Sequence, residues 1–202
     1  MTIAEKVSAS LPTLDYLKLF DYATQPRFLL PILFPFIVYL GWLRESAGSL
    51  ELHLLAALAI ALGGWLGAMI VEYQPFLAIE DGTVNEIQGM LLFVVAGTIY
   101  LLWNQNGWPV FVQHWALVAA TAVALWLPAR FVLDLSGGVI FPTAVFVYLA
   151  FMDFRFAPLL VIPVLRVPVA LKIEDLSPLE AAVGLGLGVV SVATVLLATS
   201  VW

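Results

Sequence analysis

The sequence predicts an all-α fold: a polytopic transmembrane helix bundle with about six spans and an N-terminal interfacial helix. Of the 202 residues, 63% are hydrophobic and 11% are charged, and the mean hydropathy is +1.04. Soluble domains carry about 45–50% apolar and about 25% charged residues. The apolar residues here are gathered in runs close to the ~17–25 residues that cross a bilayer as a helix. These observations identify an integral membrane protein with no soluble domain.

Residues 1–27 form the longest polar stretch and the first of two expected segments. Leu14, Leu17 and Phe20 recur at three-residue spacing, which predicts a short amphipathic helix lying on the membrane surface. A disordered lead-in is the alternative. Residues 28–202 are expected to form a single transmembrane domain.

Six apolar runs in residues 28–202 predict the spans, and five or seven are the alternatives. They are Phe28–Leu43, Leu54–Tyr73, Ile87–Trp103, Phe111–Val132, Val139–Phe154 and Leu179–Trp202. Two helix starts support these limits. The segment Thr83–Glu86 matches a capping box, and Ser177–Glu180 matches another, with Pro178 at the first helical position.

The apolar stretch 157–173 is expected to be re-entrant or interfacial rather than a span. Pro158, Pro163 and Pro168 each remove a backbone donor, for which lipid offers no replacement. Arg166 lies within this stretch. It either binds a lipid phosphate or extends its guanidinium to the headgroups.

Six antiparallel spans place the C-terminus and the loops at 74–86 and 133–138 on the face that bears the N-terminus, here called face A. The loop at 155–177 then lies on the opposite face. Lys and Arg divide four against four, which does not orient the chain. If Arg166 and Lys172 lie within the membrane, face A becomes cytoplasmic. We expect a bacterial cytoplasmic (inner) membrane location.

Acidic residues concentrate around the loop at 74–86. Arg130 and Asp134, at the end of the fourth span, return to the same face. Such a group can form a charge-paired cluster, a cation site, or a proton-transfer site in which close carboxylates hold a proton. The alternative is structural, with a helix cap, an Asp-Gly turn and a carboxylate reaching the headgroups. The candidate catalytic residues are Glu72, Glu80, Asp81, Glu86, Arg130 and Asp134.

The segment Glu80-Asp81-Gly82-Thr83-Val84-Asn85-Glu86-Ile87-Gln88 opens an apolar helix. It resembles a pattern in small uncharacterised bacterial polytopic membrane proteins, where an acidic-acidic-Gly turn precedes a Glu and often a Gln at the start of a span. The resemblance covers about 25 residues and implies a membrane location. Many such proteins carry a second acidic motif, Gly-Glu-Glu with Ser-Trp-Gly-Gln, which this chain lacks. No activity is therefore transferred.

Composition limits cofactors and partners. The absence of cysteine excludes thiolate metal sites and cysteine nucleophiles, and a net charge of −6 argues against nucleic acid. No metal is expected. His53 and His114 start two spans on the same face, so haem or chlorophyll ligation is an alternative to hydrogen bonding with interfacial water. Membrane lipids and other membrane subunits are the expected partners.

Small residues recur every three or four positions in the second and sixth spans, at Ala59, Gly63 and Gly67 and at Gly184, Gly188 and Ser191. Such stripes allow helices to approach closely, within the chain or between chains. We expect a non-catalytic accessory or assembly subunit of a larger membrane complex. The alternatives are an intramembrane lipid-handling enzyme that uses the face-A carboxylates with Arg130, and a small proton- or cation-coupled transporter.

Overall fold

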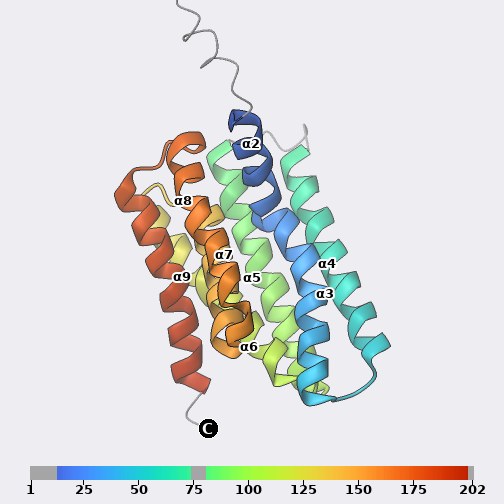
Figure 1. Cartoon of the computed structure of the whole chain (residues 1–202). Coiled ribbons are helices and arrows are strands. Elements are labelled where there is room, and N and C mark those ends of the chain that lie inside the picture. Colours follow the sequence, from blue (N-terminus) through green and yellow to red (C-terminus); the bar gives the residue numbers. More distant parts are fainter. Residues whose placement is uncertain (1–12, 74–80, 200–202) are drawn as a thin grey trace, which may run out of the picture.

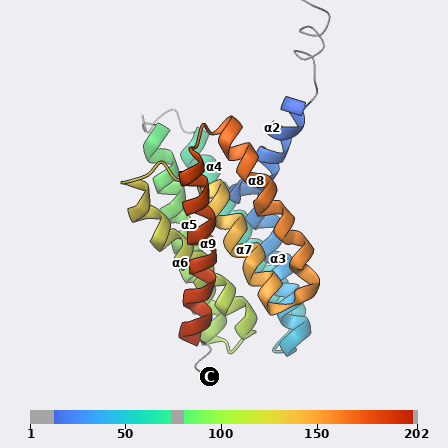
Figure 2. The ribbon, with the colours of Figure 1, turned by 60° about the vertical axis from the view of Figure 1, so that its left-hand side comes forward.

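The computed structural model describes residues 13–73 and 81–199, and the regular elements in these ranges are all helices (Figures 1 and 2). The predicted all-α polytopic bundle is confirmed. The elements are α2 (Thr13–Thr24), α3 (Pro26–Glu45), α4 (Leu50–Tyr73), α5 (Asp81–Gln105), α6 (Val110–Arg130), α7 (Gly137–Met152), the 3-10 helix η1 (Phe154–Leu160), α8 (Val161–Ile173) and α9 (Pro178–Thr199).

In the described ranges, six helical segments are long and apolar enough to cross a membrane. They are Phe28–Glu45, Leu50–Val71, Val84–Gln105, Val110–Arg130, Phe154–Ile173 and Pro178–Thr199. Five of them match predicted spans. The sixth is the stretch expected to be re-entrant, whereas the predicted span 139–154 corresponds to α7, an apolar helix of only 16 residues.

Residues 157–173 are helical rather than re-entrant because of where their prolines lie. Pro158 lies in η1, and Pro163 is the third residue of α8, where an N–H has no partner inside the helix. Only Pro168 lies in the interior of α8, at the cost of one helical hydrogen bond. The helix therefore continues where proline spacing alone predicts a break.

The chain consequently traverses the bundle once more than the six-span topology requires. In Figure 1, α7 descends from the end of the bundle near α2, and η1 with α8 returns to that end before α9 descends again. Residues 133–136 lie at the α2 end, as predicted for the loop on face A. α9 ends at Thr199 at the opposite end from α2, so the expected end of the sixth span on face A is wrong (Figures 1 and 2). Residues 200–202 lie outside the described residues.

The core is centred on α6 and α7. α7 is buried at most positions, and its close neighbour is α9. A Cβ at Gly188 would lie 2.6 Å from Thr143 Cβ and 2.8 Å from the Ile140 carbonyl oxygen, so only glycine permits this approach. The Gly184–Gly188–Ser191 stripe is thus an internal packing surface, and all three residues are buried.

The two predicted capping boxes have different outcomes. At α9, the Ser177 N–H donates to Glu180 Oε2 (2.7 Å), and the Glu180 N–H donates to Ser177 Oγ (3.2 Å). This box is confirmed, as is Pro178 at the first helical position. The box at Thr83–Glu86 is wrong, because α5 begins at Asp81 and Thr83 already lies inside the helix.

At the end away from α2, two side chains of α3 fasten neighbouring helices. Glu45 accepts hydrogen bonds from the backbone N–H groups of Val110 (2.6 Å) and Phe111 (2.8 Å), which cap the start of α6. Arg44 Nη1 donates to the Met152 carbonyl oxygen at the end of α7 (2.9 Å). A carboxylate at a helix N-terminus also interacts favourably with the helix dipole.

Candidate functional site

A cavity of about 730 Å³ lies among α3, α4, α5, α6 and α7 and reaches the ends of α2 and α8. Its lining on α5 runs from Val84 to Ile99, a rise of about 22 Å at ~1.5 Å per residue. The volume lies within the ~300–1,000 Å³ that small-molecule sites occupy. This cavity is the candidate site, and its two ends differ in chemistry.

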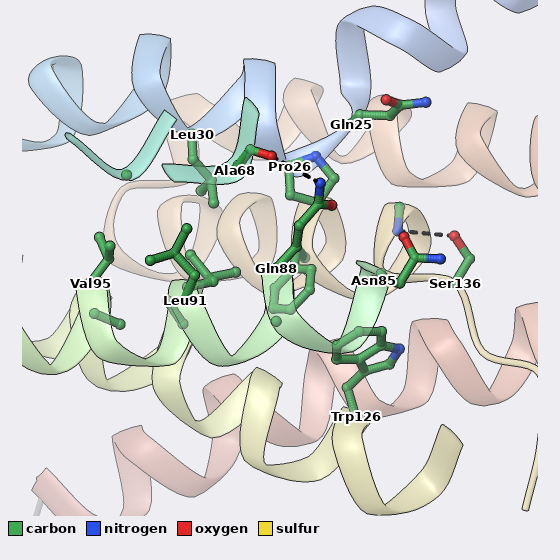
Figure 3. Close-up of a pocket in the computed structure, with 18 of the residues that line it drawn as sticks. Gln25, Pro26, Leu30, Ala68, Asn85, Gln88, Leu91, Val95, Trp126 and Ser136 are labelled. Atoms are coloured by element: carbon green, nitrogen blue, oxygen red, sulfur yellow. Dashed lines mark hydrogen bonds between the residues drawn. The ribbon is translucent and has the colours of Figure 1, made fainter. Parts of the chain in front are cut away.

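The polar end lies toward face A, where the C-terminal end of α2 meets the face-A parts of α5, α6, α7 and α8. In Figure 3, Asn85 and Gln88 extend from α5, with Ser136 beside Asn85 and Gln25 beyond Gln88. Gln88 Nε2 donates to the Ala68 carbonyl oxygen on α4 (3.4 Å). Charged side chains complete this end, and they are Asp21, Arg130, Asp134, Arg166 and Glu174.

The rest of the cavity is apolar. Leu30 on α3 and Leu91 and Val95 on α5 line it beside the polar end (Figure 3). Phe34, Ile99 and Trp115 line it furthest from face A. One cavity therefore joins a charged end to a long hydrocarbon-like wall.

Arg166 is the most deeply buried charge in the described residues, with only 1% of its side chain exposed. Its guanidinium is hydrogen-bonded to Asp21 of α2 and to Glu174 just after α8. Nε also donates to the Gly138 carbonyl oxygen (3.0 Å). A Cβ at position 138 would overlap the guanidinium, so Gly138 leaves the space that this position of Arg166 occupies.

Arg130 and Asp134 are held at the same end by the turn after α6. Trp126 Nε1 donates to the Leu135 carbonyl oxygen (3.0 Å), and the Asp134 N–H donates to Glu180 Oε1 (3.1 Å). The Trp126 ring packs where a Cβ on Gly89 would collide with it. The turn is therefore fixed against both α5 and α9.

The predicted acidic cluster is brought together only in part. Arg130 Nε lies 3.8 Å from Glu86 Oε1, a loose ion pair, and Arg130 also lies over the Trp126 ring at 5.5 Å. Asp134 shares the cavity wall with Arg130. Glu80 and the side chains of Glu72 and Asp81 lie outside the described residues.

Arg166 is placed differently from either expectation. The sequence predicts a lipid phosphate ligand or a side chain reaching the headgroups, whereas the guanidinium is buried between carboxylates of its own chain. Sequence reasoning missed Asp21 and Glu174. A signal was present, because a membrane-buried arginine requires compensating acids and few acidic residues are available.

The two histidines belong to no metal-binding group among the residues that the structure describes. In the described ranges, no group of three His, Cys, Asp or Glu side chains has metal-binding geometry. His53 is buried against Trp108, with ring centroids 4.4 Å apart and edge to face. His114 is half-buried. Haem or chlorophyll ligation by either histidine stays a prediction.

Searches of protein-family models, curated proteins and solved structures find no match to this chain. The fold and the cavity are therefore interpreted from their own chemistry.

Proposed function

We propose that this integral membrane protein binds a lipid-like amphipathic molecule in the cavity. The observation that carries the proposal is the polarity of the wall, which is charged at face A and apolar along the remaining length. Among the functions expected from the sequence, the polarity of the wall supports lipid handling. The proposal concerns binding, because Glu86 lies outside the cavity wall and Arg166 already pairs with Asp21 and Glu174.

The dimensions of the cavity agree with this ligand class. A bilayer has a hydrocarbon core of about 30 Å, so one leaflet contributes about 15 Å of chain region. A cavity about 22 Å long along α5 accommodates one leaflet's depth together with a headgroup. Polar groups at membrane depth are costly unless they have partners, and a ligand headgroup supplies such partners.

The test is to fill the cavity from the middle of α4. Ala61 lines the cavity and is nearly buried, whereas Ala59 on the same helix is exposed on the outer face. Ala61→Phe should lower the amount of lipid that copurifies with the protein at least fivefold, because the ring takes the volume of an acyl chain. Native mass spectrometry after mild detergent extraction measures bound lipid per chain.

Ala59→Phe is the matched control and should leave bound lipid unchanged. Ala119→Leu, on the α6 wall of the cavity, provides a second block if Ala61→Phe lowers the melting temperature. Equal lipid occupancy in wild type and in both folded cavity variants would refute binding in this cavity.

An accessory-subunit role remains the alternative function, favoured by one feature of α4. Ala59 and Gly63 are exposed, and no atom lies within 4 Å of a Cβ built at Gly63. Small exposed residues let a helix of another chain approach closely. The same mass spectra test this role, which requires stoichiometric partner chains that Ala59→Phe displaces. A monomer carrying lipid alone contradicts it.

We also propose that face A is cytoplasmic. The additional traverse by α8 moves Lys172 from the opposite face to face A, where it joins Lys18 and Arg130. Arg44 and Arg155 lie at the other end. Short cytoplasmic segments are enriched in Lys and Arg, so the tie in the six-span topology becomes a bias toward face A.

A further inference from the structure

The charged residues that line the cavity separate into two groups with different capacities for a ligand. Asp21, Arg166 and Glu174 form a bonded trio, and Arg130 and Asp134 form the other group. The inference below rests on the proposed function and specifies the headgroup of the ligand.

The Arg166 trio is occupied by contacts within the chain. The guanidinium bonds two carboxylates and one backbone carbonyl, and its side chain is 1% exposed. Separating these bonds to bind a ligand would leave a buried charge without its partner, which is strongly unfavourable. This trio therefore holds α2 and α8 together and does not select the ligand.

Arg130 is the second cation among the described residues of the cavity wall. Its nearest carboxylate in the described residues is Glu86 at 3.8 Å, beyond the ~2.7–3.2 Å range of a hydrogen bond. Its side chain is 17% exposed and lies over the Trp126 ring, which restricts its orientation without using its N–H groups. Its N–H groups donate no hydrogen bond to another described residue, and such a guanidinium suits a phosphate, which it can bind in bidentate fashion.

Asp134 is the matching anion. Its backbone N–H is fixed by Glu180, but its carboxylate has no hydrogen bond or ion pair with any described residue, Arg130 included. The carboxylate is exposed and lines the same cavity end as Arg130. An exposed carboxylate held on a fixed turn suits an ammonium group.

The described lining residues contain three carboxylates and two guanidiniums, a net charge of −1. This charge disfavours a purely anionic headgroup. We propose that the cavity selects a zwitterionic aminophospholipid, whose phosphate binds Arg130 and whose ammonium binds Asp134. Selectivity then combines attraction at each pole with repulsion of anionic lipids by Asp134.

The experiment offers purified protein an equimolar mixture of phosphatidylethanolamine, phosphatidylglycerol and diacylglycerol, and counts bound lipids by native mass spectrometry. Wild type should favour phosphatidylethanolamine over phosphatidylglycerol by roughly tenfold, equivalent to about 1.4 kcal/mol. Asp134→Asn should lower this ratio to about one or below, because the ammonium contact and the repulsion are both lost. Arg130→Gln should lower both phospholipids relative to diacylglycerol, and Arg130→Lys should retain them partly.

Lys172→Gln and Asp175→Asn provide the controls. Both residues are exposed at the same end of the bundle, and neither lines the cavity. Asp175 has a φ of 52°, which asparagine also tolerates. Both variants should keep the wild-type ratio, so a change in either would indicate a general surface-charge effect and overturn the proposal.

Two outcomes separate this inference from the proposed function. Cavity-dependent binding that favours phosphatidylglycerol or diacylglycerol, or a ratio that Asp134→Asn leaves unchanged, overturns the zwitterionic headgroup and leaves lipid binding intact. If wild type binds no lipid that Ala61→Phe displaces, the proposed function fails, and this inference fails with it.

Discussion

A single guanidinium determines how the N-terminal helix is attached. Arg166 bonds Asp21, which lies 145 positions away in the sequence, and Glu174, which lies 8 positions away. The buried trio adds little net stability, because desolvation of the charges offsets much of their attraction. Its value is geometric, since it fixes α2 over the end of α8 beside the cavity.

We predict that Arg166→Met destabilises the folded protein by about 3–5 kcal/mol, because two carboxylates lose their cation in a partly buried site. The triple variant with Asp21→Asn and Glu174→Gln should recover most of this loss. Unfolding in mixed detergent micelles measures both. Equal unfolding free energies of the single and triple variants would show that water solvates the two carboxylates when Arg166 is absent, which contradicts the prediction.

At the scale of helices, the close α7–α9 contact depends on glycine, which has no side chain. Gly188 faces Thr143 and Ile140 at distances that no Cβ tolerates, whereas Gly186 on the same helix has no atom within 4 Å of a built Cβ. In lipid, this kind of backbone approach substitutes for the hydrophobic force that drives packing in water.

We therefore predict that Gly188→Ala lowers the unfolding free energy by about 1–3 kcal/mol, the usual cost of overpacking. Gly186→Ala, the matched control, should leave stability unchanged or raise it by up to about 1 kcal/mol, since alanine is the better helix former. Unfolding in mixed detergent micelles compares the two variants. A smaller loss for Gly188→Ala than for Gly186→Ala would contradict the packing geometry.

The sequence predicted most helices because runs of apolar residues and a local capping box suffice to define them. It misassigned 157–173 because the cost of proline depends on its position within the turn, and Pro163 lies where no donor is needed. It located Arg130 and Asp134 at one face from topology alone. The buried Arg166 signals that acids lie nearby, but Asp21 is 145 positions away and no local pattern identifies it as a partner. The cavity was not predictable, because its wall comes from helices that are far apart in the sequence.

At the scale of the whole molecule, the return of η1 and α8 across the bundle changes which segments share a side. Arg155 and Lys172 belong to one loop under the six-span topology but lie at opposite ends of the bundle in the structure (Figure 1). Lys172 instead shares an end with Lys18. Labelling of introduced cysteines can test this arrangement without background labelling, because the sequence contains no cysteine.

We predict that a membrane-impermeant maleimide labels Arg155→Cys on intact cells and leaves Lys18→Cys and Lys172→Cys unlabelled. Inverted membrane vesicles should reverse the pattern. All three side chains are exposed, so access to the reagent depends on the membrane alone. Labelling of Arg155→Cys and Lys172→Cys from the same side would show that α8 does not cross. Labelling of Lys18→Cys from outside would reverse the proposed orientation.

Glu45 has a mechanical consequence for the bundle through the two hydrogen bonds that it accepts from the start of α6. Its carboxylate fastens the end of α3 to the start of α6, at the end opposite the charged part of the cavity. α3 and α6 are joined at this end, and both line the cavity toward face A. At face A, α3 continues from α2 through Gln25 alone, and the Arg166 trio fastens α2 to α8. Rotation of α3 away from the cavity is therefore opposed at both of its ends.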